Sequence, residues 1–395
     1  MKILVANIGS TSFKYRLLDM HVGATGRSPL QAQGRVERIG QPGGDCPTYE
    51  CAIERCLGEI VGAGRPLARL TDLDAVGFKA VHAGPLGGAR RVDEAVLRAM
   101  QEFSFFAPAH NPPYVAAMRA FQKTAPELPL VALFETAFFD SLDDATTTYA
   151  VPRAWREDFG VRRYGFHGAS HRAASERAQA LLGRSDLRHI SCHLGGSSSL
   201  AAIRGGVAVD TSFGMSPQSG LPHNNRVGDL DAYAVLYMMK KLGLDADGMA
   251  RTLARDCGLA GLSGGSGDVR DIAQAAQAGD RRARLALDVF VESIRHYLGA
   301  FLVKLGGLDV VTFSGGIGEN DPALRAACCA GLAELGIEID AGRNAALAGE
   351  GRISPDRSRV AVWVVPADEE SVVARAVATV LDTTPSASRA RGRSQ

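Results

Sequence analysis

Hydrophobic positions along the chain alternate between short continuous runs and longer stretches in which apolar residues recur every three or four positions. The short runs predict β-strands, and the longer stretches predict helices with one buried face. Helices are expected at residues 46–61, 112–124, 170–182, 229–256 with a break, and 281–305. Strands are expected at residues 2–7, 12–19, 74–82, 129–134, 188–194, 199–204, 308–313 and 359–365. Because the two kinds of element alternate, the pattern predicts an α/β fold.

Two segments that lie far apart in the chain have the same layout. Residues 3–12 and residues 189–198 each form an apolar run, then a polar residue, then a turn rich in glycine and serine, and a second apolar run follows each turn. This layout is typical of a β-hairpin. Its turn can bring backbone N–H groups and hydroxyls close to an anion. The repeat therefore predicts a duplicated, two-lobed enzyme. The alternative is that two ordinary hairpins resemble each other by chance.

Composition narrows the class of protein. A length of 395 residues exceeds one hydrophobic core and predicts two domains. The net charge of +1 gives no overall attraction to nucleic acid or to a membrane surface. The seven cysteines show no C-x-x-C spacing, which favours reduced thiols in the cytoplasm. No secretory leader is expected after Met1. The sequence has no apolar run of about 20 residues, so no membrane-spanning helix is predicted.

A third segment with a possible phosphate-binding turn begins at residue 310. An apolar strand ends in the glycines of residues 315–318, and Asp321 and Pro322 then provide a cap and a first residue for a helix. A helix N-terminus at such a loop suits a nucleotide, although a plain strand-to-helix turn has the same sequence. Neither a P-loop, nor H-E-x-x-H, nor G-x-G-x-x-G after a strand occurs. A P-loop kinase and a Rossmann dehydrogenase are therefore disfavoured.

Two histidines are candidates for a functional role. His167 lies within the sequence Tyr164-Gly165-Phe166-His167-Gly168, and His171 follows shortly after it. His167 lies between glycines, where its ring and the neighbouring backbone can both approach a substrate. His171 falls inside the expected helix, where a histidine more often caps or packs.

Six motifs in order then carry a resemblance to a known family. They are Asn7-x-Gly9-Ser10-x-Ser12-x-Lys14, Phe106-Ala107-Pro108-x-His110-Asn111-Pro112, Tyr164-Gly165-Phe166-His167-Gly168, Asp210-Thr211-Ser212 with Pro217, Ser263-Gly264-x-Ser266-x-Asp268-x-Arg270, and Gly315-Gly316-Ile317-Gly318-Glu319-Asn320. Together they resemble the acetate and propionate kinases, from Lys2 to about residue 380.

The resemblance implies a fold and a domain organisation. The fold is the duplicated two-lobed type of the sugar kinases, Hsp70 and actin, which is ribonuclease H-like and has a central cleft. The expected domains are an N-terminal lobe of residues 1–140 with 370–382, a C-terminal nucleotide-binding lobe of residues 141–369, and a disordered tail of residues 383–395. Family members are usually homodimers, and ATP with Mg²⁺ is the implied cofactor set.

The resemblance also assigns roles to residues, in a reaction where catalysis depends on positioning and on neutralising phosphoryl oxygens. The catalytic set is His167, Arg226, Glu135, Lys79 and Asn7. The substrate-binding set is Lys79, Val81, Ala109, Phe166, Pro217 and Arg226. The nucleotide-binding set is Lys14, Ser10, Ser12, His193, Gly195, Gly196, Ser197, Asp268, Val269, Arg270, Gly315, Gly316, Ile317 and Asn320. The metal-holding set is Asn7 and Glu369, with Asp368 and Glu370 as weaker candidates.

The chain departs from the family pattern at several of these positions. Lys79 stands where arginine is usual, Glu135 where aspartate is usual, and Phe139 where histidine is usual. At residue 79 the single ammonium of lysine replaces the planar guanidinium of arginine, which has five N–H donors. The two charge changes can preserve an ion pair in altered geometry, mark a different substrate, or weaken catalysis.

Two further groups of departures affect the ligands. Ala109 stands where leucine is usual, so we expect a roomier acyl pocket and an acid larger than acetate. Gly196-Ser197 and Asn224-Asn225 also differ from the usual residues near the phosphates. The retained residues 315–320 favour ATP over pyrophosphate as donor.

The sequence thus predicts reversible transfer of the ATP γ-phosphoryl to the carboxylate of a small organic acid, with no nucleic-acid or membrane partner. One alternative is a nucleotide-binding paralogue with weakened catalysis, which Lys79 and Glu135 favour. The other is a kinase of the same fold that acts on an alcohol or sugar, for which Glu135 would have to be the base.

Overall fold

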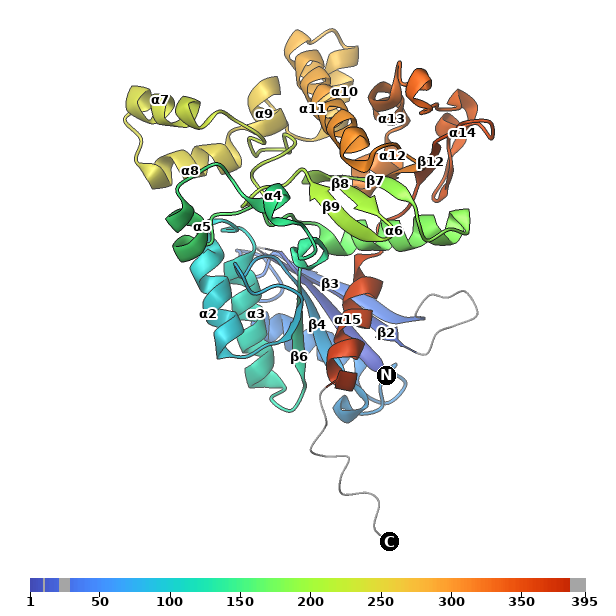
Figure 1. The fold of residues 1–395 in the computed structure, drawn as a ribbon. Coiled ribbons are helices and arrows are strands. Elements are labelled where there is room, and N and C mark those ends of the chain that lie inside the picture. The colour runs from blue at the N-terminus through green and yellow to red at the C-terminus, as the bar shows by residue number, and fades with distance from the viewer. Residues whose placement is uncertain (10, 21–28, 384–395) are drawn as a thin grey trace. The chain divides into compact units, whose positions relative to one another are not determined.

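The computed structural model describes residues 1–9, 11–20 and 29–383. The chain divides into unit 1, Met1–Ala137 with Asp368–Gln395, and unit 2, Phe138–Ala367 (Figure 1). These bounds differ by two or three residues from the expected lobes, and the difference moves Glu369 from the second lobe into unit 1. Thr383, expected in a disordered tail, is the last residue of a helix, and residues 384–395 lie outside the described ranges.

Unit 1 is built on a six-stranded mixed sheet with the order β3-β2-β1-β4-β6-β5. Strand β1 pairs antiparallel with β2 and parallel with β4, which pairs parallel with β6. The strands are β1 (Lys2–Ile8), β2 (Ser12–Asp19), β3 (Leu30–Glu37), β4 (Ala75–Ala80), β5 (Ala89–Arg91) and β6 (Leu130–Phe134). The helices and 3₁₀ turns are α1 (Tyr49–Ile60), η1 (Leu70–Asp72), α2 (Glu94–Glu102), η2 (Phe103–Phe105), α3 (Asn111–Thr124) and α15 (Glu369–Thr383).

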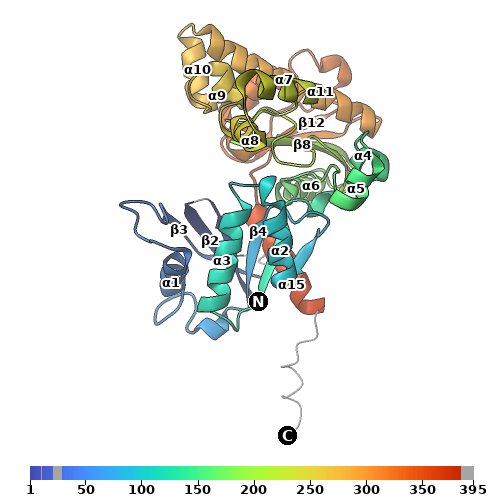
Figure 2. The same ribbon diagram turned by 90° about the vertical axis from the view of Figure 1, so that its left-hand side faces the viewer.

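Helices cover both faces of this sheet (Figure 2). Alternate residues of a strand point to opposite faces, and β4 shows the consequence. Phe78 packs edge-on against Phe121 of α3, with ring centroids 5.6 Å apart. Gly77 faces α15, where a Cβ atom would lie 2.6 Å from a methyl group of Val377. The glycine therefore allows the last helix of the chain to pack closely on the sheet.

Unit 2 repeats the topology of unit 1. Its sheet has the order β11-β12-β10-β7-β8-β9, and every pairing has the direction found at the equivalent place in unit 1. The strands are β7 (Arg188–Leu194), β8 (Ser198–Arg204), β9 (Val207–Thr211), β10 (Val310–Ser314), β11 (Gly351–Arg352) and β12 (Ala361–Val364). The duplicated α/β fold predicted from the two hairpins is confirmed.

The helices of unit 2 cover both faces of its sheet (Figure 1). The helices and turns are η3 (Ala137–Phe139), α4 (Asp144–Thr147), α5 (Arg153–Phe159), α6 (Gly168–Leu182), α7 (Ala232–Leu242), α8 (Ala246–Arg255), α9 (Gly258–Ser263), α10 (Val269–Gln277), α11 (Arg281–Leu305), α12 (Gly315–Asn320), α13 (Pro322–Cys329), η4 (Ala333–Leu335) and α14 (Ala341–Ala346). The main core lies between the sheet and α11, where Phe290, Ile294 and Phe301 are buried. Helix α6 packs against β7 and β10.

Most predicted elements are present, with ends shifted by a few residues. The predicted break in residues 229–256 falls at Gly243, which has a left-handed φ of 65° and ends α7 before Asp245 caps α8. The sequence did not predict β3, a largely polar strand at the edge of its sheet, or α15. Among the described residues, no helix is long and apolar enough to span a membrane.

Candidate active site

Unit 1 holds a cluster of one buried cation and two carboxylates. Lys79 lies on the same face of β4 as Gly77, so its side chain points toward α15. Its Nζ atom lies 2.6 Å from Glu369 Oε2 at the start of α15 and 3.3 Å from Glu135 Oε1, just after β6. The three side chains are 18%, 14% and 5% exposed. Lys79 and Glu135, the two charged residues that depart from the family pattern, therefore form an ion pair.

The charge states of this cluster follow from burial and pairing. Burial by itself would lower the pKa of Lys79, but the carboxylates of Glu369 and Glu135 outweigh it and hold that pKa well above its usual range. Lys79 therefore stays an ammonium, able to donate to oxygens.

Tyr114, on α3, connects this cluster to Asn7. Its hydroxyl accepts a hydrogen bond from the Ile8 backbone N–H at 3.1 Å and donates to Asn7 Oδ1 at 3.4 Å. Burial raises the pKa of Tyr114, whose side chain also interacts with the charges of the cluster. Sequence reasoning missed Tyr114, because it lies in a helix whose apolar period marks it only as a core residue.

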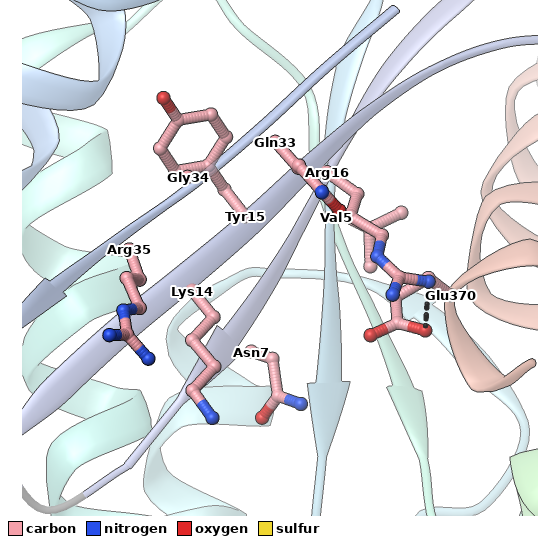
Figure 3. Close-up of a pocket in the computed structure, with 9 residues that line it drawn as sticks. All are labelled: Val5, Asn7, Lys14, Tyr15, Arg16, Gln33, Gly34, Arg35 and Glu370. Atoms are coloured by element: carbon pink, nitrogen blue, oxygen red, sulfur yellow. Dashed lines mark hydrogen bonds and ion pairs between the residues drawn. The ribbon is translucent and has the colours of Figure 1, made fainter. Parts of the chain in front are cut away.

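The hairpin turn of unit 1 places Asn7 beside Lys14. The two residues are direct partners in the β1–β2 register. They line a pocket of about 370 Å³ together with Arg16 and Glu370, which form an ion pair at 3.1 Å (Figure 3). Figure 3 shows the side chains of Asn7 and Lys14 extending in the same direction. Ser12 accepts a backbone hydrogen bond from Gly9 at 2.8 Å, while Ser10 lies outside the described residues.

The predicted metal-holding residues supply donors of the right type for Mg²⁺. Asn7 and Glu369 offer amide and carboxylate oxygens, and Mg²⁺ prefers oxygen ligands with only one or two carboxylates from the protein. Within the described ranges no group of three or more His, Cys, Asp or Glu side chains is arranged to hold a metal. Lys79 contacts Oε2 of Glu369, and a carboxylate has a second oxygen and about four lone-pair sites. The residues fit a magnesium ion that takes its other ligands from phosphates and water.

Unit 2 contains a pocket of about 530 Å³ beside the turn of its own hairpin. Eight of the predicted nucleotide-binding residues line it: Gly195, Gly196, Asp268, Val269, Arg270, Gly316, Ile317 and Asn320. Asn224, which the sequence marked only as a departure, also lines the pocket, and its backbone N–H donates to Gly196 at 3.1 Å. Asp268 caps α10 and pairs with Arg270, whose hydrogen bonds lower the pKa of Asp268 to about 2.

The predicted glycine loop of residues 315–320 is instead a short helix, α12. Gly315 begins it with a left-handed φ of 80°, and a Cβ atom there would lie 2.6 Å from the Leu194 carbonyl oxygen. The predicted helix after Asp321 is confirmed as α13, with the Asp321 side chain accepting from the Leu324 N–H. Gly315, His193 and Ser197 do not line the pocket, and Lys14 and Ser12 belong to unit 1.

Histidine and serine side chains gather on one face of the unit 2 sheet. His167 is the N-cap of α6 and has a φ of 61°, a backbone conformation that non-glycine residues rarely adopt. Its Nδ1 lies 2.9 Å from Ser199 Oγ, and its ring centroid lies 4.4 Å from that of His193. His193 Nδ1 in turn lies 2.7 Å from Ser170 Oγ. Backbone strain at a histidine with these polar neighbours is typical of a functional site.

Arg226 follows Asn224-Asn225 in a loop of unit 2. Its Nη1 donates to the carbonyl oxygen of Pro217 at 2.8 Å, so two residues predicted to contact substrate are neighbours. Burial lowers the pKa of Arg226 to about 10, and the guanidinium remains charged at neutral pH.

The other predicted acyl-pocket residues divide between the units. Val81 is buried and Ala109 exposed in unit 1, whereas Phe166 is buried in unit 2. Phe139, where the family usually has histidine, is a core residue of unit 2, packed with Leu142 and Ala201.

Both units carry one topology, and a pocket of nucleotide size opens beside the second hairpin turn. That organisation defines the class of duplicated, two-lobed α/β proteins, and the sequence motifs predict a kinase within it. The sequence model of the acetokinase family matches residues 2–375. The chain therefore belongs to the acetokinase family, and the predicted class of ATP-dependent carboxylate kinase is confirmed at that level.

Individual relatives agree with this assignment. An acetate kinase of Leifsonia xyli subsp. xyli (strain CTCB07) is 41% identical over 396 residues, covering 94% of this chain and 97% of that one. An acetate kinase of Shouchella clausii (strain KSM-K16) is 36% identical over 392 residues, covering 95% and 98%. The crystal structure of Porphyromonas gingivalis acetate kinase has a TM-score of 0.86 at 36% identity, covering 96% and 99%. A propionate kinase from Francisella tularensis subsp. tularensis SCHU S4 has a TM-score of 0.85 at 29% identity, covering 95% and 98%.

Proposed function

We propose that the protein transfers the γ-phosphoryl of ATP reversibly to the carboxylate of a small organic acid, forming an acyl phosphate. The observation that carries this proposal is the buried Lys79, which pairs with Glu135 and Glu369. The two unusual residues keep an ion pair, which favours a working site over a weakened one.

In the proposed reaction the side chains position the reactants and neutralise charge. The pocket beside Gly195 and Gly316 holds the nucleotide. His167 and Arg226 donate to phosphoryl oxygens, and Lys79 donates to the oxygens of the carboxylate. Each donor is fixed by a second contact, so little reorganisation is needed when charge develops.

Asn7 and Glu369 would hold Mg²⁺. A magnesium ion held there would supply positive charge next to the phosphate oxygens. Tyr114 keeps the amide of Asn7 in place by donating to its oxygen.

The test is trapping of acyl phosphate as hydroxamate, with ATP, Mg²⁺ and a panel of small carboxylic acids. Hydroxamate formed from at least one acid is the expected result. Tight ATP binding with no transfer to any acid would instead identify a nucleotide-binding paralogue. Phosphorylation of an alcohol or sugar alone would identify the other alternative.

We further propose that the preferred acid is larger than acetate, because Ala109 replaces a leucine. Each buried methylene adds about 0.8 kcal/mol, or about fourfold in kcat/KM. Ala109→Leu should therefore shift the preference toward acetate. Lys79→Arg combined with Glu135→Asp should shift it in the same direction if this pair sets the carboxylate geometry. A wild-type kcat/KM for acetate equal to or above that for propionate, butyrate and hydroxy acids would refute the preference.

We also propose a homodimer formed through α7. Tyr233, Leu236 and Tyr237 of this helix are 81%, 58% and 60% exposed, and none of its side chains, all within the described ranges, is buried. Such a patch favours an interface. Light scattering after gel filtration should give a dimer mass, and Leu236→Glu should give a monomer. A monomeric wild type would contradict the proposal.

A second copy also suits a groove of about 1030 Å³ in the same unit. Its lining includes the apolar Leu262 and Val289 and the acidic Asp288 and Glu292. Helix α7 ends in two lysines, at residues 240 and 241, so its apolar face and basic end complement the groove.

Finally, we propose a cytoplasmic location. All seven cysteines lie in the described ranges and are free thiols. Reduced thiols fit a reducing compartment.

A further inference from the structure

A chain of hydrogen-bonded side chains leads from His167 into the interior of unit 2. Ser199 Oγ lies 2.9 Å from His167 Nδ1 and 2.8 Å from His171 Nε2. The other ring nitrogen of His171, Nδ1, lies 2.9 Å from Ser191 Oγ. Ser191, His171 and Ser199 are almost fully buried, and His167 is partly exposed. Ser199 is thus the link between a histidine at the surface of the site and one in the core.

The register of the sheet creates this chain. Every second residue of β7 faces α6, which places Ser191 and His193 on that face. Ser199 of β8 is the direct partner of His193 and lies on the same face. His171 on α6 lies above both strands and reaches a hydroxyl on each.

The available protons limit how the chain can be arranged. Burial first, and then the neighbouring His193 and His189, lower the pKa of His171 well below its usual range, so this ring is neutral. A neutral imidazole has one N–H donor and one acceptor nitrogen, and a hydroxyl has one proton to donate. Ser199 can therefore donate to only one of its two histidines and must accept from the other.

We propose that Ser199 and His171 are positioning residues that keep the proton of neutral His167 on Nε2. In this arrangement His171 Nε2–H donates to Ser199 Oγ, and the Ser199 hydroxyl donates to His167 Nδ1. The inference rests on the proposed function, in which His167 donates to phosphoryl oxygens, because only an N–H on Nε2 can make that bond from the side of the ring away from Ser199. The reverse arrangement would present a lone pair there, which repels those oxygens.

The surroundings of His167 hold its ring in one orientation. The ring is tilted by 44° against that of His193, and the two centroids lie 4.4 Å apart. Phe213 packs edge-on against it, with centroids 5.2 Å apart. The hydrogen bond to Ser199 then sets which nitrogen of the ring carries the proton.

Kinetics of Ser199→Ala provide the first test, with Thr312→Val as the matched control. Thr312 Oγ1 lies 2.8 Å from Nε2 of the buried His189, so the control also removes a hydroxyl from a buried histidine, but one that is not hydrogen-bonded to His167, Ser199 or His171 in the contacts given above. Ser199→Ala should lower kcat by about ten- to a hundredfold with little change in the KM for ATP, because misorienting a catalytic group costs about that much. Thr312→Val should leave kcat unchanged. A kcat within about twofold for both variants would overturn the proposal.

The tautomer of His167 gives a second test that does not depend on activity. In ¹⁵N spectra of the wild-type protein, recorded above the pH at which His167 titrates, Nδ1 should have the shift of a bare nitrogen and Nε2 that of a protonated one. Ser199→Thr, which keeps the hydroxyl, should preserve this pattern, and Ser199→Ala should give a mixture. A protonated Nδ1 in the neutral wild-type ring would overturn the proposal. If no acid is phosphorylated, the proposed function fails, and these spectra still decide whether Ser199 sets the tautomer.

Discussion

Lys79 Nζ lies 2.6 Å from Glu369 Oε2, although 290 positions separate the two residues. The contact exists because the chain returns to unit 1 for its last helix, and that helix begins at Glu369. Glu369 therefore has two roles to separate: pairing with a buried lysine and, as proposed, holding Mg²⁺.

Glu369→Gln should separate these roles. We expect the Mg²⁺ concentration for half-maximal activity to rise by at least about tenfold, as is typical when a group that supports a metal is lost. The thermal midpoint should fall only slightly, because Glu135 still pairs with Lys79. The measurements are a magnesium titration of turnover and a thermal melt. Glu370→Gln tests the weaker metal-holding candidate in the same assays, because it removes a carboxylate one residue later that pairs with Arg16. An unchanged magnesium dependence for Glu369→Gln would exclude a metal-holding role.

Removing the lysine should have a larger effect on stability. Lys79→Met leaves the carboxylates of Glu135 and Glu369 without their shared cation, and breaking a buried pair in this way costs roughly 3 kcal/mol. Urea unfolding should show this loss. Glu135→Gln in the same chain should restore part of it, because one of the two charges is then gone. A double variant no more stable than Lys79→Met would show that Glu135 carries no charge repulsion in this cluster.

The nucleotide pocket offers a substitution with opposite effects on stability and binding. Gly316 lies in α12, and an added Cβ would meet no other described residue within 4 Å. Gly316→Ala should raise stability by about 0.4–1 kcal/mol, because alanine loses less chain entropy on folding. A methyl group in the pocket should weaken ADP binding by about tenfold, since overpacking costs about 1–3 kcal/mol.

Gly299→Ala is the control for this prediction. Gly299 lies in α11, and a Cβ there also meets open space among the described residues. It should raise stability in the same way with no change in ADP binding by calorimetry. Equal ADP affinity in both variants would mean that the nucleotide does not approach Gly316.

The fold was largely predictable because its signals are local. The two hairpins repeat one pattern of apolar run, turn and apolar run, and the strand orders of the two sheets bear out the duplication. Strand β3 gave no such signal: Val36 is its one buried residue, so the apolar alternation that marks a half-buried strand is missing. Helix α15 was not among the predicted helices, although residues 370–382 were expected in the N-terminal lobe, where the helix packs against β4.

The family resemblance named Asn7, Lys79 and His167 as site residues, and their roles stay predictions. The side chains that contact Asn7 and His167 come from other parts of the chain. Tyr114 reaches Asn7 across 107 positions, and Ser199 looks like part of an apolar run because only the sheet register reveals its partners. Residues 315–320 looked like a loop because glycine disfavours helix, but α12 forms there directly after β10.

The stability of unit 2 toward acid should depend on the buried His189, which does not belong to the hydrogen-bonded series of side chains from His167 to Ser191. Burial lowers the pKa of His189 to about 3, whereas an unfolded histidine titrates at about 6.5. Between these values the unfolded state binds more protons, so the contribution of neutral His189 is complete above about pH 6.5 and is lost as the pH falls. The free energy of unfolding should lose about 1.4 kcal/mol per pH unit from this residue.

His189→Gln should remove this slope. Urea unfolding from about pH 7 to about pH 4 should show the wild type losing stability faster than the variant, so that the difference between them narrows toward acid. Val311→Ala serves as the control, because it opens a cavity on the neighbouring strand without changing a titrating group. Its curve should run parallel to that of the wild type. A parallel curve for His189→Gln would mean that His189 takes up its proton in the folded protein as readily as in the unfolded chain.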